Sequence, residues 1–500
     1  MEKIKYFCNG KYKESKTDKY YELHNPSTGE ITGQAPCCTN DEVLEAIAAA
    51  KAAYPGWSAT PAIKRAQVLY KVRELLIEHL EELTMLVAEE NGKVWLEAEG
   101  DVLKAKEGTE LATQVTSLSM GESMMDTSTG FDTVQYRESI GVFAGIVPVN
   151  FPAMIPFGWM APVCLACGNT MVLKAASLTP RTALRISELY KEAGLPDGVL
   201  NVITCSRHEV NTILDHPDVK GITFVGSTSV GKLIYERAAR AGKRVQALCQ
   251  AKNHALILAD APIERTVAGI INSAFGCAGQ RCMALPCCVV EESIADIFVK
   301  ELIKQARLIK VGPANDKNSE LGPVTYEKHY EEVIANINLG MDEGAKLVLD
   351  GRNYVVEGYE KGYYVGPTIF DHVTEEMSVG TEEIFGPVVC VKRVKNFREG
   401  LAIMNANPYA NGSVIFTKSG YYAREFVRHT DGGMVGVNVG IPVPIGFFPF
   451  AGHKDSFFGD LHCLGKDSFR FFTESKCVTT RWFDDEEMKK TKVSTWDGTI

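Results

Sequence analysis

One stretch of the chain, Gly-Gln-Arg-Cys-Met-Ala at residues 279–284, combines residue types that can carry out covalent chemistry. Cys282 directly follows Arg281, and a cysteine attacks electrophiles as its thiolate, a form that a neighbouring positive charge favours. Arg281 can also hold an anionic group of a substrate beside the sulfur. A cysteine that only fills a core would have the same neighbours, because most buried cysteines are inert. The hypothesis of a catalytic Cys282 therefore depends on the rest of the chain.

A second candidate is an amide side chain within a long uncharged run. Asn150 lies between Pro148 and Pro152, inside residues 140–173, which carry no charge. A buried amide needs hydrogen-bond partners, so Asn150 either satisfies nearby backbone or stands ready for a developing oxyanion. The run is long enough for a membrane span, but its repeated prolines would break a spanning helix. We expect a buried strand, an irregular loop and a buried helix, and no association with a membrane.

Three further segments have the character of cofactor contacts. Lys174 ends an apolar strand, where it can reach ribose or phosphate oxygens. Gly226-Ser227-Thr-Ser-Val-Gly231 follows a strand and opens a helix, a position at which glycines let a dinucleotide approach the backbone. Glu382-Glu383-Ile-Phe-Gly-Pro387 can offer carboxylates to ribose hydroxyls. Each also has an ordinary structural explanation: a lysine at a strand exit, a serine helix cap at Ser227, or surface acids before a turn.

The elements that must position these residues alternate between apolar strands and helices. Amphipathic helices are expected at 40–54 and 61–90. The central strands are expected at 141–147, 170–173, 200–203, 221–225 and 255–258, with helices at 181–193, 208–215 and 229–241. Strands that are apolar throughout and separated by helices predict a parallel sheet covered on both faces. Such sheets bind ligands where strands end and helices begin.

A second α/β pattern runs from about residue 254 to 450. It contains strands at 287–290 and 388–391 and a helix at 294–309. Two α/β lobes with a reactive cysteine between them favour an enzyme with its active site in the cleft.

Bulk composition narrows the class of protein. A chain of 500 residues is too long for one compact core, and a net charge of −10 argues against nucleic-acid binding. The 14 cysteines are scattered, and the N-terminus offers no apolar signal segment, so we expect a reducing cytoplasm. Cys164 and Cys167 form half of a zinc-site pattern without a second pair, so no metal is expected.

In order and spacing, these motifs resemble the aldehyde dehydrogenase superfamily. The resemblance covers roughly residues 10–482 and rests on Pro-x-Asn-Phe-Pro at 148–152, Lys174, Phe-Val-Gly-Ser at 224–227, Cys282 and Glu-Ile-Phe-Gly-Pro at 383–387. Within the superfamily, the stretches 251–254, 279–284, 441–444 and 479–482 look like the methylmalonate-semialdehyde dehydrogenase branch, which uses coenzyme A as acyl acceptor.

The resemblance implies an α/β fold with a Rossmann-type cofactor lobe, an α/β catalytic lobe and a β-ribbon extension. The implied bounds are 1–120 and 140–253 for an NAD-binding domain, 254–466 for the catalytic domain, and 121–139 with 467–500 for the ribbon and tail. It further implies that the ribbon builds a homodimer or homotetramer.

The resemblance also implies a role for each site residue. Cys282 is the nucleophile, and Asn150 with the Cys282 backbone N–H forms the oxyanion hole. Arg281 and Lys104 bind the carboxylate of a small aldehyde substrate. The expected NAD contacts are Pro148, Phe151, Lys174, Ser177, Gly226, Ser227, Glu383 and Phe385, of which Phe385 positions the nicotinamide.

The departures from the family pattern carry information of their own. Hydrolytic members have Glu-Leu-Gly-Gly-Lys where this chain has Leu248-Cys-Gln-Ala-Lys252, so leucine replaces the base that activates water. Ser177 stands where relatives carry a ribose-binding glutamate, which leaves NADP open beside NAD. Lys104 stands where the branch has an arginine, and a lysine is a point charge and not a fork.

These observations predict NAD-dependent, coenzyme A-acylating and decarboxylating oxidation of methylmalonate or malonate semialdehyde, giving propionyl-CoA or acetyl-CoA. Two alternatives remain at this point: another NAD(P)-dependent aldehyde dehydrogenase acting on a different small aldehyde, and a non-catalytic protein that kept the fold.

Overall fold

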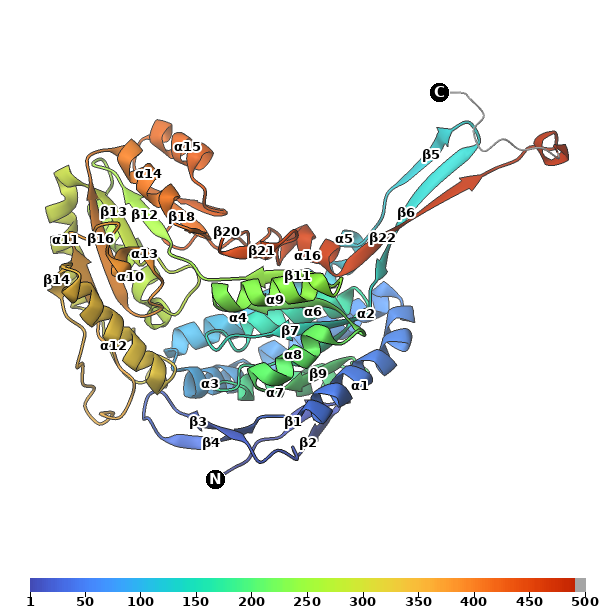
Figure 1. Ribbon diagram of the computed structural model, residues 1–500, viewed down its shortest axis with the longest axis horizontal. Coiled ribbons are helices and arrows are strands. Elements are labelled where there is room, and N and C mark those ends of the chain that lie inside the picture. The colour runs from blue at the N-terminus through green and yellow to red at the C-terminus, as the bar shows by residue number, and fades with distance from the viewer. Residues whose placement is uncertain (491–500) are drawn as a thin grey trace.

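The structure, a computed structural model, describes residues 1–490 and consists of two α/β lobes and a projecting arm (Figure 1). The first lobe is built on an eight-stranded sheet in the order β2-β1-β9-β8-β7-β10-β11-β21, in which β1 (Tyr6–Cys8) and β2 (Lys11–Lys13) form one edge. Its parallel centre comprises β7 (Val142–Ile146), β8 (Thr170–Lys174), β9 (Leu200–Ile203), β10 (Val219–Val225) and β11 (Arg244–Leu248). Read in chain order, this is the 3-2-1-4-5 arrangement of a doubly wound fold, in which the strand order reverses between β7 and β10.

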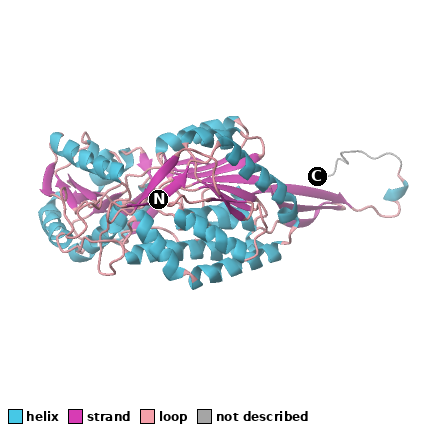
Figure 2. Ribbon diagram, turned by 90° about the horizontal axis from the view of Figure 1, so that it is seen from below, coloured by secondary structure: helices cyan, strands magenta, loops and turns pink. Residues whose placement is uncertain are grey.

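The uncharged strands of this sheet are buried because helices cover both faces (Figure 2). Along β7 the side chains alternate: Ala144 and Ile146 pack with one group of helices and Phe143 with the other. The first group comprises α1 (Asn40–Ala59), α8 (Arg207–Asp215) and α9 (Thr228–Arg240); the second includes α2 (Ala62–Glu78), α3 (Leu80–Asn91), α4 (Trp95–Thr113), α6 (Ala161–Ala166) and α7 (Arg181–Glu192).

The expected helix 61–90 is interrupted at one residue. His79 leaves helical geometry, with φ −97° and ψ 18°, so α2 ends at Glu78 and α3 begins at Leu80. The uncharged run 140–173 forms β7, a loop, the π-helix η1 (Ile155–Met160), α6 and β8. Within residues 1–490, no helix combines the length and the apolarity that crossing a bilayer requires.

The second lobe carries a seven-stranded sheet in the order β14-β15-β16-β13-β12-β18-β19. Its strands are β12 (His254–Ile257), β13 (Cys287–Glu291), β14 (Lys346–Leu349), β15 (Thr368–Asp371), β16 (Val388–Val394), β18 (Gly412–Phe416) and β19 (Met434–Val437), all parallel except β14. Helices α10 (Ile263–Phe275) and α11 (Glu292–Ala306) cover one face, and α12 (Glu327–Asp342), α14 (Phe397–Ala406) and α15 (Gly420–His429) cover the other.

The arm is a three-stranded ribbon that extends away from both lobes (Figure 1). It comprises β5 (Ser123–Ser128), β6 (Phe131–Ser139) and β22 (Thr473–Arg481), and β22 pairs with β6 along its whole length. The last part of the expected ribbon and tail, residues 491–500, lies outside the described residues.

One short strand lies in a different lobe from the one expected. β21 (Phe457–Gly459) falls within the expected catalytic segment 254–466, but it pairs antiparallel with β11 and extends the cofactor-lobe sheet. The chain therefore returns to the first lobe before it enters the arm. Such a short strand has no periodicity from which its partner could be inferred.

Candidate active site

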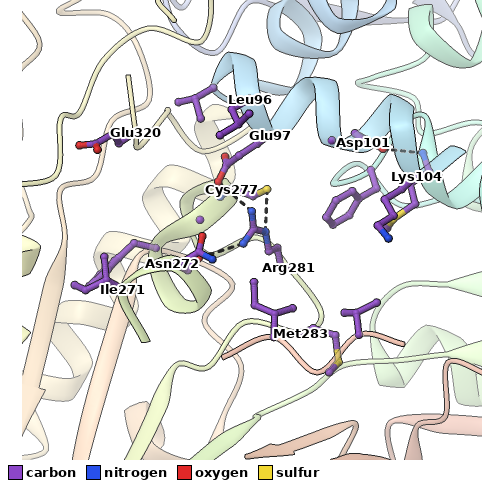
Figure 3. Close-up of a pocket in the computed structure, with 18 of the residues that line it drawn as sticks. Leu96, Glu97, Asp101, Lys104, Ile271, Asn272, Cys277, Arg281, Met283 and Glu320 are labelled. Atoms are coloured by element: carbon purple, nitrogen blue, oxygen red, sulfur yellow. Dashed lines mark hydrogen bonds and ion pairs between the residues drawn. The ribbon is translucent and has the colours of Figure 1, made fainter. Parts of the chain in front are cut away.

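Cys282 opens into a cavity of about 1060 Å³ whose lining comes from both lobes (Figure 3). α4 and Phe151 contribute from the first lobe, and α10 and the loop around residues 308–320 contribute from the second. The later segment 441–464 lines the remaining side. The half-buried thiol is therefore accessible to a small molecule that enters from solvent.

The segment before Cys282 is held in an uncommon backbone conformation. Cys277 (φ 51°), Ala278 (φ 52°) and Gly279 (φ 72°) are left-handed in succession, which costs free energy for the two residues that carry a Cβ. A Cβ at Gly279 would collide with the carbonyl oxygen of Gly386. The cysteine loop thus packs directly against the backbone of the Glu-Ile-Phe-Gly-Pro segment.

Two asparagines fix the backbone of the cysteine itself. Asn253 donates from Nδ2 to the carbonyls of Cys282 and Ala284, each at 2.8 Å, and its Oδ1 accepts the N–H of Gly412 at 2.7 Å. Asn411 donates to the same Cys282 carbonyl at 3.1 Å. Neither asparagine was identified as a site residue from the sequence, although Asn253 lies in the signature 251–254.

The structure brings Asn150 to the cysteine loop. Asn150 follows β7, is 4% exposed, and donates from Nδ2 to the carbonyl of Gln280 at 3.0 Å. An amide nitrogen carries two N–H groups, so the second remains for another acceptor. Gln280 lies two residues before Cys282, so the amide contacts the loop that carries the cysteine.

Burial controls the ionisation of the thiol. It raises the pKa of Cys282 to about 12, and the nearby Glu383 carboxylate acts in the same direction. Backbone N–H groups and the Arg281 guanidinium lower this pKa, but by less. The influence expected of Arg281 is therefore present and is outweighed by desolvation. Burial also raises the pKa of Glu383 to about 7. The N–H of Ala251, which donates to this carboxylate at 3.1 Å, lowers the pKa by less than burial raises it.

Both expected substrate-binding cations line the cavity, and each contacts a glutamate of α4. Arg281 Nη2 lies 3.1 Å from Glu97 Oε1, and its Nε donates to Cys277 Sγ at 3.2 Å (Figure 3). Lys104 Nζ lies 2.5 Å from Glu107 Oε2. A substrate carboxylate would therefore share these cations with protein carboxylates.

The expected cofactor residues of the first lobe gather at the carboxyl ends of β7, β8 and β10. Ser227 precedes α9 and is exposed; its hydroxyl lies 3.4 Å from that of Ser229 and does not cap a backbone N–H of the helix. Gly226 and Pro148 border the point where the strand order reverses. This edge fits a dinucleotide, since a helix N-terminus at such a crevice is suited to a pyrophosphate, although the first N–H of α9 already donates to Gln250 Oε1 at 3.1 Å.

The environment of Lys174 also suits a dinucleotide bound at this edge of the sheet. Its ammonium is half-buried, burial lowers its pKa, and it makes no ion pair or hydrogen bond with the part of the chain that the structure describes. A cation in such a place needs a polar partner, which a ribose or phosphate oxygen would supply. Ser177 lies half-buried three residues further along the chain.

The remaining cofactor residues lie on two different surfaces. Glu383 and Phe385 precede β16, and Phe385 (φ 59°) is held by His329, whose Nε2 lies 2.8 Å from its carbonyl oxygen. Phe151 lines the cavity into which Cys282 opens. Sequence position alone does not reveal which way a side chain leaves an irregular loop.

The stretch that carries a glutamate in hydrolytic relatives contributes an apolar side chain here. Leu248 ends β11, is 5% exposed, and belongs to the hydrophobic cluster against which Cys282 packs. It pairs with Phe457 of β21. This position therefore supplies no proton acceptor.

Comparison with known proteins identifies the family of this chain. The model of the aldehyde dehydrogenase family matches residues 12–478. Malonate-semialdehyde dehydrogenase 2 of Geobacillus kaustophilus is 46% identical over 482 residues, 96% of this chain and 99% of that protein. The methylmalonate-semialdehyde dehydrogenase structure from Oceanimonas doudoroffii is 41% identical, with a TM-score of 0.95 over 97% of this chain and 99% of that one. A Sinorhizobium meliloti protein solved as a complex with NAD is 38% identical, with a TM-score of 0.95 and the same coverage. The chain belongs to the aldehyde dehydrogenase family.

Proposed function

We propose that the protein oxidises malonate or methylmalonate semialdehyde with NAD and transfers the acyl group to coenzyme A. The observations that carry this proposal are the Cys282 thiol at the cavity, the Asn150 amide held against the loop that carries it, and the apolar Leu248 at the position of the missing glutamate. The relatives named for these two semialdehydes, similar over nearly their whole length, support the choice of substrate.

The first half-reaction makes an acyl-enzyme. Cys282 loses its proton and attacks the aldehyde carbon, and the second N–H of Asn150 and the Cys282 backbone N–H receive the developing oxyanion. Glu383, with a pKa of about 7, is the titratable neighbour that can take up the proton. Bound NAD supplies the acceptor for the hydride that leaves the same carbon. Lys174, Gly226, Ser227, Glu383 and Phe385 would hold it, with Pro148 and Ser177 beside them.

The second half-reaction releases the acyl group. The substrate's β-carboxylate leaves as CO₂ from the Cys282 thioester, and a proton takes its place on the α-carbon. The thiolate of coenzyme A then attacks the thioester carbonyl, which forms the acyl-CoA and releases Cys282 as its thiolate. Water competes poorly because base assistance, worth about 10²–10⁴-fold, is absent at Leu248.

The carboxylate of the substrate binds Arg281, with Lys104 at the side of the cavity. A second candidate function, oxidation of a small neutral aldehyde, draws support from the pairing of these cations with Glu97 and Glu107. Because Ser177 is uncharged, it would not repel the 2′-phosphate of NADP, so both nicotinamide cofactors belong in the test.

A steady-state assay tests the proposal. Malonate semialdehyde, methylmalonate semialdehyde and propanal are each supplied with and without coenzyme A, and with NAD or NADP. We expect rapid NADH formation only with a semialdehyde and coenzyme A, and no turnover by Cys282→Ala. Equal rates without coenzyme A would refute acyl transfer, and faster turnover of propanal would favour the second candidate.

The assembly and location form part of the proposal. The arm bears exposed apolar side chains, including Met124 and Met125, and suits strand pairing or packing with another copy in a homodimer or homotetramer. All 14 cysteines are unpaired, which supports a reducing cytoplasm.

A further inference from the structure

A buried ion pair lies behind the loop that carries Asn150. Lys93 lies between α3 and α4, and Asp101 lies on α4; Lys93 Nζ is 2.7 Å from Asp101 Oδ2. The two side chains are only 2% and 0% exposed. Removing both charges from water costs several kcal/mol per ion, so such a pair is poor evidence for stability alone. Its contacts indicate another role.

The pair holds the Asn150 loop at three points. Lys93 Nζ donates to the main-chain carbonyl of Asn150 at 2.5 Å and lies 3.5 Å from the centre of the Phe151 ring. Asp101 accepts the N–H of Met154 at 2.7 Å through its other carboxylate oxygen. The two charges thus fix both the start and the end of residues 150–154.

A neighbouring network fixes the acceptor of the Asn150 side chain. Asn91 donates to the Val149 carbonyl at 2.8 Å and to Thr325 Oγ1 at 3.3 Å. Thr325 donates from N and Oγ1 to Gln280 Oε1, at 3.2 and 3.1 Å. Gln280 in turn accepts the Asn150 amide through its carbonyl. The Lys93–Asp101 pair supplies the charged anchors of this arrangement.

We propose that the Lys93–Asp101 pair positions the Asn150 amide for acyl-enzyme formation at Cys282. The inference rests on the proposed role of Asn150 as an oxyanion donor. Without the pair, residues 150–154 lose the three contacts described above. Because a displacement of about 1 Å at a reacting centre can cost about 10²-fold in rate, we expect a loss of that size.

The test measures the single-turnover rate of NADH formation without coenzyme A, which reports acylation alone. Lys93→Met should lower this rate about 10²-fold while the dissociation constant of NAD stays unchanged. Lys93→Met/Asp101→Leu removes both charges together and leaves no unpaired ion, which favours retention of the fold. Lys71→Met is the matched control, since Lys71 forms an exposed pair with Glu74 at 3.4 Å.

A double-mutant cycle separates positioning through Asn150 from a general structural effect. If Lys93 acts through Asn150, adding Lys93→Met to Asn150→Ala should change the rate by no more than about twofold. An equal loss in both backgrounds would overturn the inference, as would a folded Lys93→Met/Asp101→Leu variant with the wild-type rate. A wild-type rate for Asn150→Ala alone would instead refute the proposed role of Asn150.

Discussion

Replacing Leu248 by glutamate should give the enzyme a coenzyme A-independent activity. Leu248 is buried at the end of β11, at the position where the resemblance places the water-activating glutamate of hydrolytic aldehyde dehydrogenases. General-base assistance to water is worth about 10²–10⁴-fold. Burial raises the pKa of a carboxyl group, so part of this gain is lost at neutral pH and recovered as the pH rises. At a pH above the pKa of the new carboxyl group, we expect the coenzyme A-independent rate to rise by at least about 10²-fold.

The substitution also has a cost in stability that can be measured separately. Losing a buried leucine removes about 1.5–3 kcal/mol of apolar burial. Leu248→Gln is the matched control, because it has a similar shape and burial cost but supplies no base. The assay compares NADH formation without coenzyme A in wild type and both variants, after thermal denaturation has shown that each is folded. Equal coenzyme A-independent rates in Leu248→Glu and Leu248→Gln would refute the reasoning.

Three further predictions follow from the site. Asn253→Ala leaves the Cys282 carbonyl with only one of its two asparagine donors. The substitution should lower the free energy of unfolding, measured by denaturant titration, by about 1–3 kcal/mol. An unchanged free energy of unfolding would show that the contact is dispensable. Glu97→Gln releases Arg281 and should lower the KM for malonate semialdehyde but not for propanal, and a raised KM would contradict the shared-cation geometry. The pKa of Cys282 is raised to about 12, so the rate of its alkylation by iodoacetamide in the cofactor-free enzyme should increase about tenfold per pH unit from pH 7 to 9. A plateau of this rate below pH 8 would indicate a lower pKa.

The sequence predicts the framework better than the details of the site. The apolar runs give the expected positions of β7, β8, β9 and β10, because strands buried on both faces exclude charge. β11 escapes this signal, since it begins with Arg244 and buries Gln246, which accepts a hydrogen bond from Thr223. The break at His79 is equally hidden, because apolar spacing continues across it from α2 into α3.

Long-range contacts of the site could not be predicted from spacing. Asn253 and Asn411 meet at Cys282 only because β12 and β18 are neighbours in the folded sheet. The pairing of Arg281 with Glu97 likewise joins the two lobes. The motif residues were found because they adjoin strand ends or turns, whereas residues that hold them in place carry no local signature.

The most direct test of the account is the mass of the protein after one turnover without coenzyme A. The enzyme is incubated with NAD and malonate semialdehyde, quenched in acid and digested. We predict an acetyl group as a thioester on the peptide that contains Cys282, lost on addition of coenzyme A and absent from Cys282→Ala. An unmodified Cys282 peptide despite NADH formation, or the acyl group on another cysteine, would contradict it.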